Sequence, residues 1–157
     1  MLPTTEAARV RSVRQTGQLT MPSVKRKCER CGTELEVQFG QAANHWASGL
    51  GWWTSYRCSE CGNAAEADGG ADMPDALRQM IIEEEGLWIA ELAPGTPLDA
   101  HILKAVRGVL SLTMEQVGAF KRAGTTTLAS GTRAEMEQIR SDLAKRGVAA
   151  LARRHVG

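Results

Sequence analysis

Cys28-Glu29-Arg30-Cys31-Gly32 has a counterpart later in the chain, Cys58-Ser59-Glu60-Cys61-Gly62. Every cysteine of the chain belongs to one of these two C-x-x-C pairs. At this spacing both sulfurs of a pair turn toward one metal ion, and the glycine that follows suits the left-handed backbone that completes such a knuckle. Two knuckles supply the four sulfurs of a structural, tetrahedral zinc site. The predicted ligands of a single structural Zn²⁺ are Cys28, Cys31, Cys58 and Cys61.

The same four sulfurs leave a second metal open, because paired cysteine knuckles also hold iron in electron carriers of the rubredoxin type. Disulfides are not expected. The amino-terminal stretch MLPTTEAARVRSVRQTGQLT lacks the continuous apolar core of a signal peptide, and no apolar run approaches the ~20 residues of a membrane span. The sequence thus predicts a cytoplasmic protein, in which thiols stay reduced and bind metal.

Composition indicates a globular protein, because 43% of the residues are hydrophobic and 24% are charged. The chain of 157 residues allows one ordinary domain or two small ones. Its net charge of +1 conceals an uneven distribution. Residues 1–27 carry six basic residues and one acid, whereas residues 59–99 carry ten acids and one base. Such charge separation favours oriented association with another protein over uniform binding of nucleic acid.

The amino-terminal part of the chain divides into a tail and a zinc ribbon. Residues 1–23 show no periodicity and are predicted to be a disordered tail, within which Met21 is an alternative natural start. The ribbon is predicted at residues 24–72, and metal binding is expected to supply much of its folding free energy. Its expected elements are a strand at 33–39 with Leu35, Val37 and Phe39 on one face, a loop at 40–51, a return strand at 52–57 and a short strand at 63–67.

Aromatic residues gather between the two knuckles. Trp46, Trp52 and Trp53 would stack on unpaired bases, anchor a protein partner, or cover the thin core of the ribbon. Trp52 and Trp53 are neighbours in a predicted strand and must point to opposite faces, so one of them should face another domain or a partner. His45 is expected to be a surface or hydrogen-bonded residue, because four cysteines already fill the metal shell.

The rest of the chain is predicted to be a connecting helix at residues 73–86, capped by Asp72, followed by an α/β domain at residues 87–157. Its periodicity gives the order β-α-α-β-α-β, and the fold class is therefore α+β. The expected elements are a strand at 87–92, a helix from near Leu98, a second helix from Thr113 to Ala123, a strand at 125–130, a third helix opened by a Thr132–Glu135 capping box, and a strand at 148–153.

This order, together with the stretches ILKAVRG at 102–108 and SLTMEQV at 111–117, resembles the carboxy-terminal domain of the bacterial ribosomal stalk protein. The match runs from about Leu87 to Arg154, and the Clp protease adaptor ClpS uses the same fold. In the stalk family a basic patch on the first two helices recruits translational GTPases. Lys104 and Arg107 match two positions of that patch, whereas Glu115 and Gly118 stand where the family has lysines. The resemblance implies a scaffold for protein contacts, with Lys104 and Arg107 as partner-binding residues.

The leading functional hypothesis is a non-enzymatic bacterial protein-binding module, such as an accessory subunit, an adaptor or an immunity protein, with a structural zinc site. An enzyme is not expected, because the sequence offers no catalytic constellation and a four-sulfur metal site has no open position for water. The alternative is a ribosome- or nucleic-acid-associated zinc-ribbon protein that uses the ribbon tryptophans and the basic stretch Lys25-Arg26-Lys27.

Overall fold

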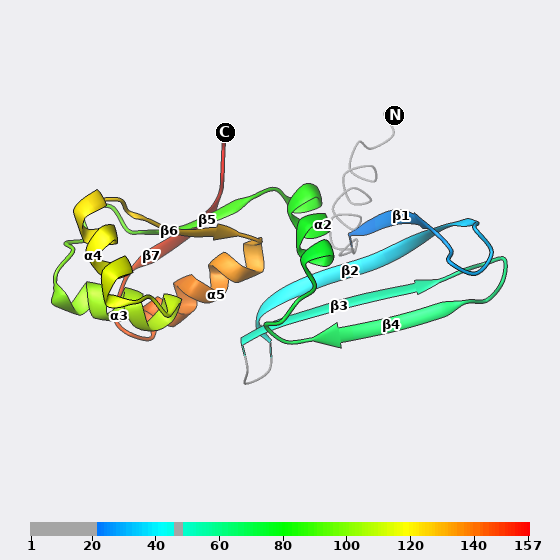
Figure 1. Ribbon diagram of the computed structural model, residues 1–157, viewed down its shortest axis with the longest axis horizontal. Helices are drawn as coiled ribbons and strands as arrows, with labels where there is room; N and C mark the ends of the chain where they lie inside the picture. The colour runs from blue at the N-terminus through cyan, green and yellow to red at the C-terminus, as the bar shows by residue number, and fades with distance from the viewer. Residues whose placement is uncertain (1–21, 46–48) are drawn as a thin grey trace, which may run out of the picture.

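The protein has a mixed α+β fold with two antiparallel sheets, seen in a computed structural model that describes residues 22–45 and 49–157 (Figure 1). The first sheet has the strand order β1-β2-β3-β4, and the second has the order β6-β5-β7. The described elements are β1 (Ser23–Lys27), β2 (Glu34–His45), β3 (Gly49–Arg57), β4 (Ala64–Gly69), α2 (Asp75–Glu85), β5 (Trp88–Leu92), α3 (Ala100–Leu110), α4 (Met114–Ala123), β6 (Thr127–Gly131), α5 (Arg133–Ala144) and β7 (Ala150–Arg154).

The first strand, β1, was not predicted from the sequence. Most of the predicted tail, residues 1–21, lies outside the described residues, but Ser23 already pairs with Gln38 of β2. The three basic residues at 25–27 therefore belong to an edge strand of the sheet, where all of them are exposed. Lysines on an edge strand discourage pairing with another sheet, which is a structural reason for this charge run.

The predicted loop at residues 40–51 is wrong, because β2 continues to His45 and β3 already begins at Gly49. Gly40, the first residue of the predicted loop, has a partner on the neighbouring strand. Gly40 lies directly opposite Trp53, and a Cβ atom built on Gly40 would lie only 2.1 Å from the indole ring. Gly40 therefore leaves room for an aromatic ring that lies across the strand, an arrangement that protects the bare backbone of a strand glycine.

Gly40→Ala is expected to lower the free energy of unfolding by about 1–3 kcal/mol, because the new methyl group displaces the Trp53 ring. Denaturant unfolding of the metal-loaded protein, followed by far-UV circular dichroism, measures the loss. Gly70→Ala is the matched control, since a Cβ there meets only the Leu50 carbonyl oxygen at an ordinary 3.8 Å. Equal stability of the two variants would contradict the close packing of Trp53 on Gly40.

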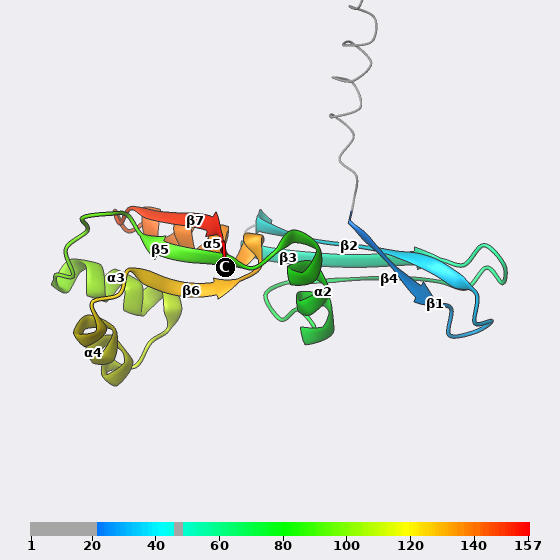
Figure 2. The ribbon, with the colours of Figure 1, turned by 90° about the horizontal axis from the view of Figure 1, so that it is seen from above.

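The two faces of the first sheet have different surroundings. Phe39 and Trp52 lie on one face and pack with Leu77 and Ile81 of α2, and Figure 2 shows α2 lying against that face. Trp53 lies on the other face, so the predicted opposition of the two tryptophans is confirmed. The helix α2 lies inside the predicted stretch 73–86, at Asp75–Glu85, but Asp72 is not its cap: the N-cap residue is Pro74, and no side chain caps the helix.

The second sheet is packed against helices through one apolar core. Leu92 of β5 meets Val106 of α3 and Leu143 of α5, all three of them nearly inaccessible to solvent. The element types in residues 88–154 follow the order β-α-α-β-α-β. The predicted caps are confirmed, because Thr113 and Thr132 each form a complete capping box at the start of α4 and α5. These local signals explain why the helices begin where they do.

A cluster of polar contacts joins α2 and the first sheet to the start of α5. Arg78 donates two hydrogen bonds to the Glu135 carboxylate, from Nε at 2.8 Å and from Nη2 at 2.9 Å. Glu135 also accepts from the Thr132 backbone N–H, and the buried Thr132 hydroxyl bonds Gln41 of β2. The capping box of α5 is thus also the joint between the two sheets.

A double-mutant cycle on Arg78→Ala and Glu135→Ala is expected to give a coupling free energy of about 1–2 kcal/mol, because the pair is bidentate and mostly shielded from solvent. The two side chains are 32% and 21% exposed. Lys25 and Glu34, at 69% and 65% exposed, form the control pair, for which we expect at most about 0.5 kcal/mol. Equal coupling in the two cycles, measured by denaturant unfolding, would contradict this account of the joint.

None of the helices described in residues 22–45 and 49–157 combines the length and the apolar character that a bilayer span requires.

Candidate metal centre

The two cysteine knuckles have the same backbone geometry. In the first, the N–H of Gly32 donates to the Cys28 carbonyl at 2.8 Å, and in the second the N–H of Gly62 donates to the Cys58 carbonyl at 3.0 Å. Both glycines have left-handed φ angles, +74° and +71°, which a residue with a Cβ adopts only at a cost of about 1–2 kcal/mol. The prediction that these glycines complete the knuckles is confirmed.

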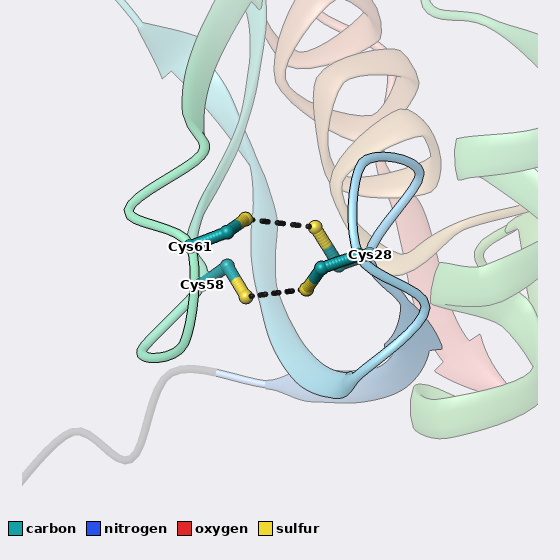
Figure 3. Close-up of side chains that lie close together, drawn as sticks. Cys28, Cys58 and Cys61 are labelled. Atoms are coloured by element: carbon teal, nitrogen blue, oxygen red, sulfur yellow. Dashed lines mark hydrogen bonds between the residues drawn. The ribbon is translucent and has the colours of Figure 1, made fainter.

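The knuckles bring the four sulfurs together at one end of the first sheet (Figure 3). The Sγ atoms of Cys28 and Cys61 lie 3.6 Å apart, and those of Cys31 and Cys58 lie 3.5 Å apart. All four Sγ atoms are within 4.8 Å of one another. These separations exceed the ~2.05 Å of a disulfide bond, and all four cysteines are free thiols. The residues predicted as metal ligands therefore form one cluster.

The cluster fits a tetrahedral thiolate site. Zn–S bonds of about 2.3 Å place the corners of the tetrahedron about 3.8 Å apart, close to the 3.5 and 3.6 Å of the two measured pairs. Cys28 and Cys58 are buried and Cys31 is exposed, so the site sits at the surface with its inner half in the ribbon. Four sulfurs of this kind could hold zinc or another thiophilic ion such as iron.

The surroundings of the sulfurs favour a bound cation. Hydrogen bonding from the backbone N–H of Cys31 is the main cause that lowers the pKa of the Cys28 thiol to about 6. The backbone N–H of Asn63 favours the Cys61 thiolate, but burial and the neighbouring sulfurs together raise the pKa of Cys61 to about 11. Four thiolates this close repel one another, and a divalent cation would remove this repulsion.

Two residues beside the cysteine cluster were not predicted from the sequence to support it. Asn63 Nδ2 donates to Cys28 Sγ at 3.9 Å and to the Tyr56 hydroxyl at 3.4 Å. Tyr56 also packs against the small apolar cluster around Leu35 and the buried cysteines. The position of Asn63, directly after the second knuckle, is the one sequence signal that could have indicated a role in supporting the ligands.

The predicted partner-binding residues are not brought together. Lys104 and Arg107 are exposed on α3, at the end of the molecule opposite the knuckles (Figure 1). Trp53 is half-buried in the middle of the first sheet, and Trp52 packs into the core beneath α2. Trp46 lies outside the described residues. His45 is the last residue of β2, which begins at Glu34 just after the first knuckle. The eleven residues between these two positions span about 36 Å along an extended strand. The backbone of His45 is therefore far from the sulfurs.

Comparisons with protein-family models, with curated proteins and with solved structures give no match to this chain. The resemblance to the stalk protein therefore stays a prediction.

Proposed function

We propose that this protein is a non-enzymatic bacterial protein-binding module of the cytoplasm, in which a structural zinc ribbon is fixed to a stalk-like α/β domain. The observation that carries the proposal is the clustering of four cysteine sulfurs within 4.8 Å. Four protein ligands complete a tetrahedral shell, so the metal would stabilise the fold and would leave no position for a substrate or a water.

The joint between the two sheets supports a role in presenting surfaces. The Arg78–Glu135 pair binds α2 to the start of α5, and the Thr132–Gln41 contact binds the ribbon to it. Both bonds connect residues that are far apart in the sequence, 57 and 91 positions respectively. A ribbon held in this way would keep a constant orientation relative to α3, which pre-organises both parts for a partner and lowers the entropic cost of binding.

The α/β domain supplies the first candidate surface. Lys104 and Arg107 are exposed and project from one stretch of α3, and the element order of residues 88–154 agrees with the predicted stalk-like domain. An ordinary solvated helix face would also carry such residues. A partner with an acidic surface would distinguish a binding surface from a solvated helix face, because its binding would depend on the positive charges of both Lys104 and Arg107.

Affinity purification of the tagged full chain from a lysate of its source organism tests the proposal. We expect one protein to be recovered in stoichiometric amount, and the Lys104→Glu/Arg107→Glu variant to recover at least about tenfold less of it. Lys121→Glu/Arg122→Glu on α4 is the matched control, because both residues are exposed and carry the same charge. A wild-type chain that recovers no stoichiometric protein would overturn the proposal.

A shallow hollow beside the knuckles supports the second candidate, binding of single-stranded nucleic acid. The hollow has a volume of about 230 Å³, with basic residues at its rim and Tyr56 among its apolar lining. Its lining residues are Arg26, Lys27, Cys28, Glu29, Leu35, Val37 and Tyr56. An unpaired base could stack on Tyr56 while Arg26 and Lys27 contact phosphates.

This second candidate predicts binding of a labelled oligouridine that weakens steeply between low and physiological salt. Arg26→Glu/Lys27→Glu should abolish the change in fluorescence anisotropy, and Lys25→Glu with Arg57→Glu serves as the control of equal charge outside the hollow. Binding that is independent of salt, or unchanged in the first variant, would exclude this role for the hollow.

A further inference from the structure

The four edges of the two sheets are protected in different ways. The edge strand β1 carries Lys25, Arg26 and Lys27. In the second sheet, β7 carries Arg153 and Arg154, and the pairing of β6 is interrupted by a register shift. Charged residues, lysine above all, and bulges are devices by which proteins keep an open edge from pairing with another strand, and basic residues or a bulge occur at these three edges. Three of the four edges in the described part of the chain therefore have such a device.

The remaining edge strand, β4, has neither basic residues nor a bulge. Its six residues, AAEADG, contain no lysine, arginine or proline, and its pairing with β3 is continuous from Ala64 to Gly69. All of the residues from Ala64 to Asp68 are exposed, and within residues 22–45 and 49–157 the strand pairs with β3 alone. Because three of the side chains are alanines, little bulk would obstruct an additional strand. The outer backbone groups of β4 are thus open to pairing.

The only charged side chains of β4 are two acids on the same face. Glu66 lies opposite Ser55, and Asp68 lies opposite Trp53, so both acids point to the face that carries Trp53 and not to the face covered by α2. A strand added to this edge would place every second side chain beside these carboxylates, since directly opposed residues share a face. The identity of those side chains then decides whether pairing is favourable.

A second copy of this chain is a poor occupant of the edge. If two β4 strands paired antiparallel across a two-fold axis, residues of the same face would stand opposite each other. In the registers that pair most of the strand, centred on Glu66 or on Ala67, Glu66 would face Glu66 or Asp68 of the other copy, and like charges directly opposite each other destabilise a sheet. A strand with basic residues at alternate positions would gain the opposite-charge pairs instead.

We infer that the free edge of β4 accepts an extended segment of a protein partner, and that this segment carries Lys or Arg at alternate positions facing Glu66 and Asp68. The backbone of β4 would supply hydrogen bonds to any strand, and the two carboxylates would select a basic one. This inference rests on the proposed protein-binding function and adds to it a second surface, distinct from α3, together with the chemistry of its partner.

The test uses the metal-loaded full chain, labelled with ¹⁵N, and a short peptide that alternates valine with lysine. We expect the peptide to shift the backbone amide signals of β4 and β3, and a peptide that alternates valine with glutamate to leave them in place. In Glu66→Lys/Asp68→Lys, we expect affinity for the lysine peptide to fall at least about tenfold, because two attractive pairs become repulsive. Glu83→Lys/Glu84→Lys on α2 makes the same change of net charge at exposed positions and should bind like the wild type.

Three results would overturn the inference: amide shifts that lie outside β4 and β3, equal binding of the two peptides, or unchanged affinity in Glu66→Lys/Asp68→Lys. A dimer of the wild-type chain that pairs through β4, detected by light scattering and by loss of the dimer in that variant, would overturn it as well. A stoichiometric partner recovered equally by that variant and by the wild type would leave the proposed function standing while refuting the role of β4.

Discussion

Cys58→Ser is expected to abolish metal binding and to unfold the first sheet. The four sulfurs are the centre of a small core in which the two buried cysteines pack with Leu35, so the sheet has little else to hold its knuckle end together. Binding of a structural zinc ion contributes roughly 10–16 kcal/mol of apparent free energy at neutral pH, and a hydroxyl group is a poor substitute for a thiolate ligand. Metal analysis should find one ion per wild-type chain and almost none in the variant.

The amide spectrum of the same variant shows which part of the chain depends on the metal. Signals of the strands next to the knuckles should collapse into the unfolded region, whereas those of α3, α5 and β5 should persist, because these elements share their own core around Leu92 and Leu143. Ser59→Ala is the control, since Ser59 is exposed within the knuckle and supplies no sulfur. A Cys58→Ser variant that retains its metal and a native spectrum would contradict the metal centre. Strong visible absorption by the wild-type protein would identify iron in place of zinc.

Phe39→Ala is expected to lower the free energy of unfolding by about 3–5 kcal/mol. Phe39 has no solvent exposure and packs against Leu77 and Ile81, which are 7% and 1% exposed. Removal of the ring leaves a cavity between the first sheet and α2, and α2 has no side-chain cap of its own to hold it in place. Denaturant unfolding of the metal-loaded protein measures the loss.

Phe39→Leu is the matched variant, and a smaller loss is expected because leucine fills part of the space left by the ring. Metal content should stay the same in both variants, since the sulfurs form a separate cluster around Leu35. A loss below about 1 kcal/mol in Phe39→Ala would show that α2 does not depend on this contact.

The features that could be predicted from the sequence are the ones encoded within a few residues. Each knuckle is complete within four residues and a following glycine, and the start of α5 is marked by Thr132 and Glu135. Such signals are local, because the groups that form the hydrogen bonds are close neighbours in the chain. The grouping of the four ligands followed from their chemistry, because four thiolates at knuckle spacing suit a single ion.

The features that could not be predicted depend on residues far away in the sequence. Gly40 was placed in a loop at 40–51, but it lies in a strand, where it makes room for the ring of Trp53 on the neighbouring strand. The pairing of Arg78 with Glu135 joins residues 57 positions apart, and neither residue carries a local mark of the other. Asp72 is a residue type that often caps helices, yet the N-cap residue of α2 is Pro74 and no side chain caps the helix. Tertiary packing decided the first two.

The separation of α3 from the first sheet has a consequence for stoichiometry. The two lie toward opposite ends of the molecule (Figure 1), and the contact between Thr132 and Gln41 holds the first sheet to the start of α5. A protein bound to α3 and a strand bound along β4 would therefore not compete for space. One chain could then bridge two partners, or two sites of one partner. In the second case, binding at one end would raise the effective concentration at the other, and two weak contacts would act as one strong one.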